Sequence, residues 1–368
     1  MTMFFYSVVL VLGASLFAQA IARFPIPSVD CQSLPQASYP FCDPKLTPET
    51  RATDLVSRLT VDELISQTFY LAPAISRLGI NAYNWRSNCA HGWTLSGGPD
   101  WLGYTWTVFP APIGMAATFD KDLVLKAGQV TSTEGRALHN EIMTHYNGAS
   151  QEATGLNCYS PVVNLLRDSR WGRAQETFGE DPYLLSQIGV AYTKGLQEGS
   201  DPTYVKIAAS PKHFSVHSGP DNIRNRFTAN TTLHDLYDTY LAAFKSQVIG
   251  GKAMQIMPAL SGMRCEKEED GAPDAANPFL LQTVLREQFG APNISVVSDN
   301  EAIEQVYSDH HFASSYEQAA ALCMNASTDL DLGDTTYIKY LPVALKDNLV
   351  HFSGSVPVDQ WQSDKHAR

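Results

Sequence analysis

A regular alternation of short apolar runs with longer helical segments constrains the fold of this chain more than any other feature. The short runs are rich in β-branched residues and lie at 157–163, 204–209, 252–257 and 294–298. Segments with helical patterning separate and follow them, at 120–141, 182–197, 233–248, 278–289 and 315–325. This spacing predicts parallel strands joined by helical crossovers. A doubly wound sheet and a (β/α)8 barrel both satisfy the pattern.

Polar residues at the ends of these strands distinguish the two folds. Lys212 and His213 end one strand, and Asp299 follows another. The carboxyl ends of the strands are where a (β/α)8 barrel builds its active site. No Gly-rich phosphate loop follows the first strands, as a nucleotide-binding sheet would require. The sequence therefore favours a (β/α)8 TIM-type barrel that uses no cofactor. No metal is expected either, because no histidine has H-E-x-x-H or similar ligand spacing.

The two ends of the chain differ from the region between them. Residues 3–19 are apolar, and Ala18 with Ala20 forms an A-x-A cleavage site. This pattern is typical of a secretory signal peptide, with a membrane anchor as the alternative. No later stretch is long and apolar enough to span a bilayer. We expect a signal peptide at 1–20, an irregular Pro-rich segment at 21–46, the barrel at 47–350 and an irregular tail at 351–368.

Secretion determines how the cysteines and asparagines are interpreted. The six cysteines show no C-x-x-C and no zinc pattern. In an oxidising compartment some of them should pair; six allow 15 pairings, among which Cys31 with Cys42 would be a local bridge. Sequons at Asn230, Asn293 and Asn325 fit a secreted, extracellular glycoprotein. A net charge of −12 disfavours nucleic acid or another polyanion as the partner.

Residues 47–66 are expected to form one helix. Thr47 supplies an N-cap, Pro48 occupies the first helical position and Glu49 makes the first turn acidic. Leucines spaced along the segment supply an apolar face that packs this helix onto the rest of the domain.

The segment 83–112 has a different character. It contains four of the six tryptophans, Trp85, Trp93, Trp101 and Trp106, among Gly, Pro and Asn residues that exclude regular structure. An aromatic-rich loop at the mouth of a barrel suits stacking against the apolar faces of sugar rings. Packing of the rings onto the barrel is favoured for any single tryptophan, whereas at least one of the four is expected to contact ligand.

Three groups of residues suggest chemistry. Asp299 lies between an apolar strand and a helix that begins near Glu301, where a fixed carboxylate can attack an anomeric carbon; an N-cap role is the alternative. Lys212 and His213 can donate hydrogen bonds to sugar hydroxyls, although most such pairs are surface charge. The segment 167–182 is dense in Arg and Glu around Trp and Gly, which indicates either a fixed polar network or a salt-bridge cluster at a helix start.

Taken together and in order, these segments resemble glycoside hydrolase family 3, in the branch of secreted fungal and plant β-xylosidases and β-glucosidases. The resemblance covers about Pro40 to Val350. Its signature is RDSRWGRAQETFGEDP, and the supporting segments are PFCDPKLTPETRATDLVSRLT, YNWRSNCAHG, KHF and VVSDNEAI. Each is weak alone, but their joint occurrence in this order is specific.

The resemblance implies roles for individual residues. Asp299 corresponds to the family's nucleophile. Lys212, His213 and Arg173 correspond to residues that hold the sugar in the −1 subsite, and Arg226 corresponds to a further arginine downstream. The segment with Trp85 is similar to the family's Tyr-Asn-Trp loop, so this residue is expected at the substrate as well. The implied reaction is hydrolysis of β-linked glucosides or xylosides with retention of configuration, through a glycosyl-enzyme intermediate.

Three departures from the family pattern bear on activity. Asn88 stands where xylosidase-like members have a carboxylate, and Met257 stands where a tyrosine usually lies beside the nucleophile. Two-domain members carry the general acid on a C-terminal α/β sandwich, which the resemblance does not reach, and single-domain members use a histidine in a longer motif than the one around His217. We therefore expect a glycosidase barrel whose activity is impaired unless that domain or another polypeptide supplies the acid. The alternative is a secreted, catalytically lapsed carbohydrate-binding homologue.

Overall fold

The computed structural model describes residues 29–93, 103, 105–333 and 335–350. The expected signal peptide, the expected tail at 351–368 and Trp101 lie outside these residues. Among the described residues, no helix is both long and apolar enough to cross a membrane.

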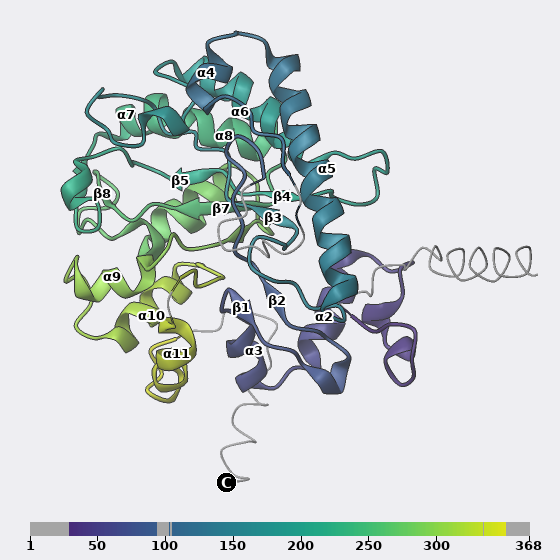
Figure 1. Ribbon diagram of the computed structural model, residues 1–368. Coiled ribbons are helices and arrows are strands. Elements are labelled where there is room, and N and C mark those ends of the chain that lie inside the picture. Colours follow the sequence, from purple (N-terminus) through teal and green to yellow (C-terminus); the bar gives the residue numbers. More distant parts are fainter. Residues whose placement is uncertain (1–28, 94–102, 104, 334, 351–368) are drawn as a thin grey trace, which may run out of the picture.

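Short parallel strands form the centre of the molecule (Figure 1). Strand β3 (Asn157–Cys158) pairs in parallel with β4 (Ala208–Ala209). Strands β5 (Lys212–Phe214), β7 (Gln255–Pro258) and β9 (Ser295–Val296) form one parallel sheet in the order β5-β7-β9. The prediction of parallel strands joined by helical crossovers is therefore confirmed for these segments.

Further pairings extend this set of strands in both directions. Single parallel bridges join Val162 to Lys212, Val297 to Leu330, and Asp331 to Phe69. Strand β1 (Leu71–Ala72) then pairs antiparallel with β2 (Tyr83–Asn84). Tyr159 N, directly after β3, donates to Ser87 O at 3.2 Å. This bond joins the segment after β2 to the segment after β3. A separate parallel pair is made by β6 (Thr228–Asn230) and β8 (Gly262–Arg264).

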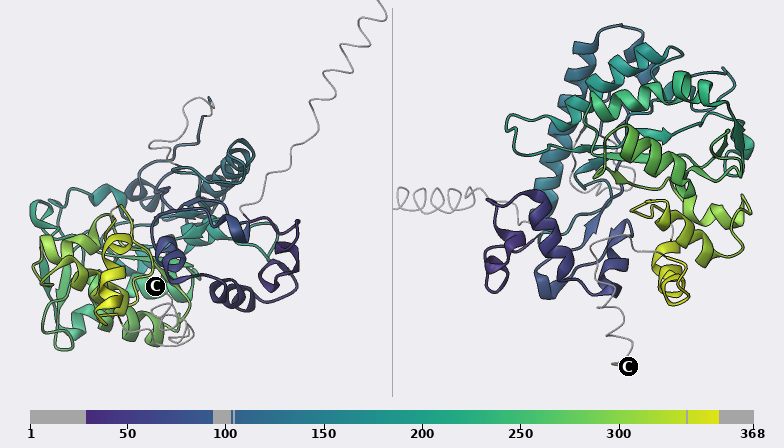
Figure 2. Two further views of the ribbon diagram at one scale, coloured as in Figure 1. Left: turned by 90° about the horizontal axis from the view of Figure 1, so that it is seen from below. Right: turned by 180° about the vertical axis from the view of Figure 1, so that it is seen from behind.

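The long helices lie outside the strands, as Figures 1 and 2 show. Asp120 caps the first of them, because its Oδ1 accepts hydrogen bonds from Asp122 N and Leu123 N, each at 3.0 Å. The main helices are α5 (Lys121–His145), α6 (Pro182–Gln197), α8 (Ala242–Ile249), α9 (Ala302–Ser308), α10 (Tyr316–Asn325) and α11 (Thr336–Lys346). The shorter ones are η1 (Gln36–Ser38), η2 (Pro40–Cys42), η3 (Ser76–Leu78), α4 (Pro112–Ala116), η5 (Ala174–Glu176), η6 (Asp221–Ile223), α7 (Leu233–Asp235) and η8 (Asp274–Ala276).

Two predicted helices contain π-helical turns. The segment expected at 233–248 is divided into α7, the π-helical η7 (Leu236–Tyr240) and α8, and the segment expected at 278–289 is the π-helical η9 (Phe279–Gln288). Apolar periodicity locates such segments correctly but does not distinguish hydrogen bonding to the fourth preceding residue from bonding to the fifth.

The single helix expected at 47–66 is wrong, because the segment forms two helices. Helix α2 (Pro48–Ser57) begins after Thr47, whose side chain accepts from Thr50 N, so the predicted N-cap is correct. Thr60 then starts α3 (Val61–Gln67) with a capping box, in which its hydroxyl accepts from Glu63 N and the Glu63 carboxylate accepts from Thr60 N. A capping box fixes a helix start, so the continuous pattern is interrupted there.

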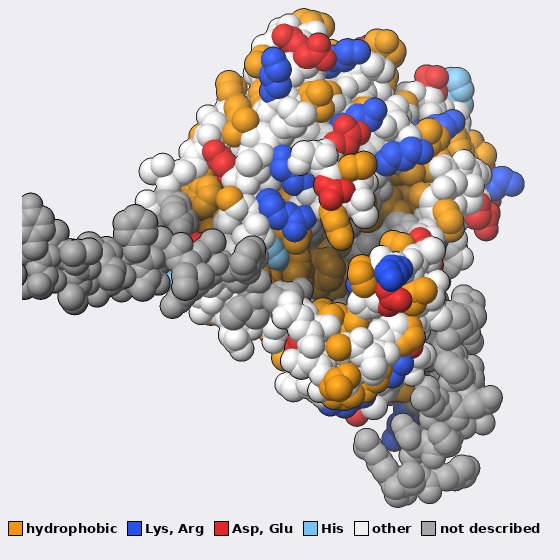
Figure 3. Space-filling view, turned by 90° about the vertical axis from the view of Figure 1, so that its right-hand side faces the viewer, with side chains coloured by type: hydrophobic (Ala, Val, Ile, Leu, Met, Phe, Trp, Pro, Cys, Tyr) orange, Lys and Arg blue, Asp and Glu red, His pale blue; other side chains and the backbone are white. Residues whose placement is uncertain are grey.

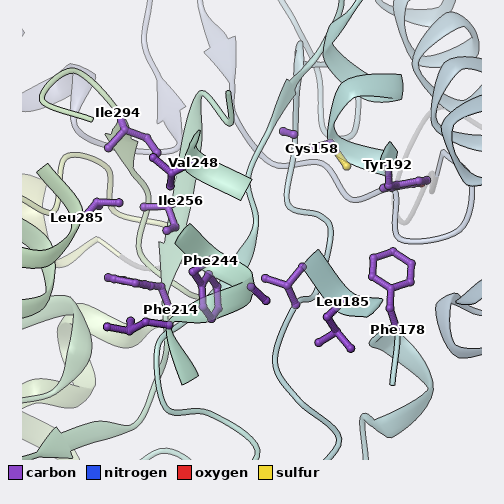
Figure 4. Close-up of a cluster of buried hydrophobic side chains, with 14 of the residues drawn as sticks. Cys158, Phe178, Leu185, Tyr192, Phe214, Phe244, Val248, Ile256, Leu285 and Ile294 are labelled. Atoms are coloured by element: carbon purple, nitrogen blue, oxygen red, sulfur yellow. The ribbon is translucent and has the colours of Figure 1, made fainter. Parts of the chain in front are cut away.

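Close contact between α5 and α6 anchors the main core. A Cβ at Gly195 of α6 would lie only 2.4 Å from Leu125 O of α5, so the helices approach where there is no side chain. The core continues under the strands, and Figure 4 shows Phe178, Leu185 and Tyr192 on one side and Phe214, Phe244 and Ile256 on the other. On the face seen in Figure 3, positive and negative side chains are interspersed, and no patch of a single sign is visible.

The described residues form two disulfides, one local and one between distant parts of the chain. Cys31 bonds to Cys42, the local bridge named among the possible pairings, and Cys89 bonds to Cys158 of β3. Cys265 is a buried thiol. The second disulfide ties the aromatic segment that follows β2 directly to the central strands, so it fixes a loop that the sequence leaves without regular structure.

Removal of the Cys89–Cys158 bond is expected to lower the free energy of unfolding by about 4 kcal/mol, since the bond restricts the loops open to the unfolded chain. The two cysteines are 69 positions apart, against 11 for Cys31 and Cys42. The double variant Cys89→Ala/Cys158→Ala should therefore lose more stability in urea than Cys31→Ala/Cys42→Ala, for which about 3 kcal/mol is expected. An equal or smaller loss for the first variant would contradict this explanation.

Candidate active site

The predicted site residues come from strands that lie side by side. Lys212 and His213 belong to β5, and Asp299 lies three residues beyond the end of β9. Strand β7 lies between them and places Met257 opposite Lys212 in the parallel register. Because the strands are parallel, their carboxyl ends face the same way, and this brings residues 87 positions apart in sequence together.

Asp299 is the carboxylate at the centre of this cluster. Its side chain is 14% exposed, and its Oδ2 lies 3.6 Å from His213 Nε2. Its Oδ1 accepts a hydrogen bond from Asn300 N at 2.7 Å. Burial raises the pKa of Asp299, while the charges of Lys212 and Arg173 and the Asn300 N–H oppose that rise. The carboxylate is thus partly desolvated: Oδ1 is fixed by a hydrogen bond, whereas Oδ2 is buried and has no hydrogen-bond partner among the described residues.

The N-cap alternative for Asp299 does not hold. Helix α9 begins at Ala302, and its N-cap position is occupied by Glu301, which has a left-handed φ of 64°. Next to this turn, Gly333 has a φ of 91°, and a Cβ there would lie 2.0 Å from Asn300 Oδ1. The chain after Asp299 therefore packs closely against the segment at Gly333, whose left-handed φ favours glycine.

Arg173 connects the signature segment to His213. Its Nε and Nη2 donate to the two carboxylate oxygens of Glu176 at 2.7 and 2.8 Å, and its Nη1 lies 3.2 Å from His213 Nε2. Burial disfavours ionisation of Glu176, but the hydrogen bonds and charge of Arg173 outweigh it, so the pKa of Glu176 is lowered. The Arg173–Glu176 pair is a salt bridge at the start of η5, as the second alternative expected, while the contact to His213 links it to β5, as a fixed polar network would. By contrast, Arg170 is exposed and pairs only locally with Asp168.

His213 is held as a neutral ring. Burial, followed by the charges of neighbouring cationic groups, lowers its pKa well below the ordinary value. Its Nδ1 lies 3.4 Å from Asn164 Oδ1, a carbonyl oxygen that can only accept, so the ring proton belongs on Nδ1. Nε2 then accepts from Arg173. The 3.6 Å contact to Asp299 is therefore not an ion pair.

Lys212 and His217 complete the buried part of the cluster. Burial and the nearby charge of Arg173 lower the pKa of Lys212 to about 8, although Asp299 and Glu176 oppose this. The His217 ring lies 4.4 Å from the His213 ring, centre to centre, and burial lowers its pKa to about 3. Near neutral pH, His217 is an uncharged ring beside the site, and its sequence position close to Lys212 and His213 was the only signal for it.

One predicted residue is not brought to the cluster. Arg226 is exposed, whereas Arg224, two positions earlier, is half-buried and its charge acts on Asp299, His213 and Glu176. Both arginines lie in the irregular loop between η6 and β6, where spacing along the chain gives no side-chain direction. Sequence reasoning therefore identified the correct loop but not Arg224.

Met257 and Trp85 form an apolar wall beside the site. Met257 is 1% exposed and packs with Tyr159, Val297 and Leu330, and the half-buried Trp85 packs on the same cluster. Strand β9 continues through Val297 to Asp299, so this wall adjoins the carboxylate. No polar atom of Met257 can bind a hydroxyl group as a tyrosine would. Among the other tryptophans of the segment, Trp93 is fully packed and donates its Nε1–H to Ala153 O at 2.8 Å.

Asn88 is exposed but already engaged. Its Oδ1 accepts hydrogen bonds from Cys89 N at 2.9 Å and from Ser160 Oγ at 3.0 Å. The amide oxygen therefore stabilises the loop next to the Cys89–Cys158 disulfide. In the part of the chain that the structure describes, no group of three or more His, Cys, Asp or Glu side chains is arranged to hold a metal ion.

Comparison with known proteins assigns the chain to a family. Residues 94–353 match the model of the glycosyl hydrolase family 3 N terminal domain. The chain belongs to glycosyl hydrolase family 3. A xylan 1,4-beta-xylosidase of Xylanibacter ruminicola is 38% identical over 316 residues, and a probable exo-1,4-beta-xylosidase of Aspergillus fumigatus is 37% identical over 342 residues.

Solved structures agree with the sequence match. A family 3 exo-beta-xylosidase in complex with a xylobiose aziridine activity-based probe superimposes with a TM-score of 0.77 at 33% identity and covers 89% of this chain. A β-glucosidase from Erythrobacter marinus gives a TM-score of 0.68 at 25% identity. The chain spans only 41% of the first structure, and 35% and 42% of the two xylosidase sequences above.

Proposed function

We propose that this family 3 chain is the catalytic barrel of a retaining β-glycosidase that acts on β-xylosides in preference to β-glucosides. One observation carries the proposal: the partly buried Asp299 carboxylate has one oxygen, Oδ2, that lies 3.6 Å from His213 Nε2 and accepts no hydrogen bond from the described residues, where parallel strands lie side by side. The preference for xylosides is supported by the named activities of the relatives that are 37–38% identical.

We propose further that the central strands are the staves of a (β/α)8-type barrel with irregular first strands. Consecutive pairings support this fold, because they run from β3 through β5, β7 and β9 to Leu330, and from Asp331 through Phe69 to β1 and β2. The antiparallel β1–β2 pair would be the irregular part. In such a barrel the active site lies at the carboxyl ends of the strands. Asp299 lies beyond the carboxyl end of β9, and Lys212, the first residue of β5, pairs with Met257 near the carboxyl end of β7.

In the proposed mechanism, an oxygen of Asp299 attacks the anomeric carbon and the bond to the leaving oxygen breaks, with its electron pair going to that oxygen. Asp299 is suited to this role because only its Oδ1 is hydrogen-bonded. Lys212 and Arg173 supply N–H donors for sugar hydroxyls, and their positive charge opposes the rise in the pKa of Asp299 that burial causes. A water molecule then hydrolyses the glycosyl-enzyme ester.

Protonation of the leaving oxygen needs a second group. Glu176 does not suit this role, since both of its oxygens bind Arg173 and its pKa is lowered. His217 does not suit it either, because its pKa of about 3 leaves it without the extra proton at neutral pH. We propose that the acid comes from outside the described residues, as a further domain or another polypeptide. General acid catalysis is typically worth about 10²–10⁴-fold in rate.

A catalytically lapsed carbohydrate-binding protein is the second candidate. Two observations favour it: Met257 presents no polar atom beside the nucleophile, and the Asn88 oxygen is engaged by Cys89 and Ser160. Such a protein would bind xylosides through Lys212 and Arg173 without forming a covalent intermediate. Covalent labelling therefore separates the two candidates.

The test uses substrates that need no acid. A dinitrophenyl 2-fluoro-β-xyloside has a leaving group that departs unprotonated, and its intermediate hydrolyses slowly, so a stable adduct should accumulate on the protein. Intact-protein mass spectrometry should show the adduct, with faster labelling by the xyloside than by the matching glucoside. Folded protein that binds xylose yet forms no adduct with either compound would support the lapsed binding protein instead.

Secretion stays a proposal as well. It is supported by the apolar N-terminus and by the two disulfides, which suit an oxidising compartment. Of the three sequon asparagines, Asn230 and Asn293 are exposed, whereas the Asn325 amide donates to Leu349 O at 2.9 Å. Glycan is therefore expected on the first two, which peptide mapping of the secreted protein would show; an intact Met1 and no mass shift on deglycosylation would contradict secretion.

A further inference from the structure

Strand β5 departs from regular pairing at the residues that form the site. Lys212 pairs with Met257 and Phe214 pairs with Pro258. The chain therefore advances two residues along β5 but only one along β7, and the register shifts. A strand that leaves its ladder exposes backbone groups that must find other partners when they are buried. His213 and Ser215 are both 1% exposed, so their peptide groups cannot rely on solvent.

Two buried side chains take over these backbone groups. The Asn164 amide accepts from His213 N at 2.7 Å and donates to His213 O at 2.9 Å and to Ser215 O at 3.2 Å. On the far side of the strand, Asp274 Oδ2 accepts from Ser215 N at 2.9 Å. Ser261 Oγ, in the segment before β8, donates to Val216 O at 3.1 Å.

Asp274 is unusual among these partners because it is a carboxyl group with no exposed surface. No cation bonds to it among the described residues, and Ser215 N is its hydrogen-bond donor. Burying a carboxyl group without a cation is costly, so its retention at the end of β5 requires an explanation. Backbone contacts in turn fix Asp274: its N donates to Ser261 O at 3.0 Å, and it lies in η8, whose Ala275 O accepts from Thr328 Oγ1 at 2.7 Å.

We propose that Asp274 is a positioning residue for the sugar-binding pair, holding Ser215 N so that Lys212 and His213 stay fixed against Asp299. The expected effect of Asp274 on labelling rests on the proposed function, whereas its expected effect on the surroundings of His213 does not. What the position requires is an acceptor for one amide N–H, and the neutral carboxylic acid supplies it. The carboxyl carries no specific charge interaction with the site: the charged group that acts on it is Glu268, of the same sign.

The protonation state agrees with this role. Burial, followed by Glu268, raises the pKa of Asp274 well above its usual value, although the Ser215 N–H opposes the rise. The folded protein thus holds a proton that the unfolded chain releases above about pH 4. Stability from this group is present below that pH and is lost as the pH rises toward the folded-state pKa. Asp274→Asn, which keeps an acceptor without a titrating proton, should lack this loss.

The experiment compares Asp274→Ala and Asp274→Val, which remove the acceptor, with Asp274→Asn, which keeps it. Asp329→Ala is the matched control, because Asp329 Oδ2 likewise accepts a strand N–H, from Val296 of β9 at 2.7 Å. The first readout is the rate of labelling by the dinitrophenyl 2-fluoro-xyloside. The second is the pKa of His213, followed by ¹⁵N NMR and assigned by loss of its signals in His213→Gln. The second readout needs no activity.

We expect Asp274→Ala to label at least about tenfold more slowly and the pKa of His213 to rise toward its ordinary value of 6.5, as solvent reaches the ring. Asp274→Asn and Asp329→Ala should stay within about threefold of wild type in labelling and leave that pKa unchanged. If Asp274→Ala does not fold, Asp274→Val carries the comparison, because its apolar side chain fills the buried position without supplying an acceptor. If wild-type protein forms no covalent adduct, the proposed function is refuted. The pKa of His213 in the Asp274 variants then still tests whether Asp274 positions His213. An unchanged His213 pKa in folded Asp274→Ala, or an Asp274→Asn variant as impaired as Asp274→Ala, would overturn the inference.

Discussion

Replacing Asp299 with asparagine is expected to abolish covalent labelling by the dinitrophenyl 2-fluoro-xyloside, with a loss of at least about 10³-fold in rate. An amide oxygen is a poor nucleophile and cannot form the glycosyl ester. The fold should persist, because the side chain keeps its shape and an amide oxygen can still accept from Asn300 N, as Oδ1 does now at 2.7 Å. Intact-protein mass spectrometry before and after incubation gives the measurement.

The same variant is expected to be more stable than wild type at neutral pH. Burial raises the pKa of Asp299, which means that the folded state disfavours its ionised form. The stability associated with this group is present at low pH and is lost as the pH rises above the value of the unfolded chain, near about 4. The amide that replaces the carboxylate never ionises. Thermal unfolding of Asp299→Asn should therefore occur at a higher temperature than that of wild type at neutral pH, and at a similar temperature in acid below the unfolded-state pKa.

Asp221→Asn is the matched control for the loss of labelling. Asp221 also lies near the cluster, where its Oδ2 accepts from Gly172 N at 2.6 Å and its charge acts on Arg173. It is exposed and has no role as a nucleophile, so its variant should label at nearly the wild-type rate. An adduct that forms on Asp299→Asn, or one that maps to the peptide containing Glu176, would show that the nucleophile is assigned wrongly.

The sequence predicted best those features that depend on local periodicity and chain order. The apolar runs located β3, β4, β7 and β9, and their parallel pairing followed from the helices between them. Asp299 and His213 could be predicted to meet because parallel strands present their carboxyl ends on one face. The single helix at 47–66 was predicted wrongly because the apolar pattern continues through Thr60. In the structure α2 ends at Ser57, and the capping box at Thr60 starts a second helix.

Features that depend on side-chain direction could not be predicted in the same way. Arg224 and Arg226 lie in one irregular loop, and only the folded backbone turns Arg224 toward the cluster. Asn164 and Asp274 bind peptide groups of a strand whose register shift has no signal in the sequence. Asn88 could be recognised as a departure from the family, but its bonds to Cys89 and Ser160 depend on the return of the chain at β3.

Arg173→Ala is expected to have the second largest effect, with labelling in mild acid reduced by about 10²-fold, because it removes a hydroxyl donor and changes the charge on the nucleophile together. Glu176 would lose both of its donors, now at 2.7 and 2.8 Å, while still half-buried. A carboxylate left in this way costs about 2 kcal/mol of folding free energy. Because burial is the main influence on Glu176 once Arg173 is gone, its pKa should rise, and it should bind a proton more readily than in wild type.

The pH dependence of labelling gives the sharper test of the same variant. Only ionised Asp299 attacks, so the labelling rate falls as the pH falls through its pKa. Burial raises that pKa and Arg173 is one of the charges that lowers it, so Arg173→Ala must shift the acid side of the pH–rate profile to higher pH. Arg286→Ala is the control: Arg286 is paired with Asp329 at 3.3 Å and does not act on Asp299, so that variant is expected to lose stability but to keep the wild-type profile. A profile for Arg173→Ala that is lower in rate but unshifted in pH would mean that Arg173 holds the substrate without tuning the nucleophile.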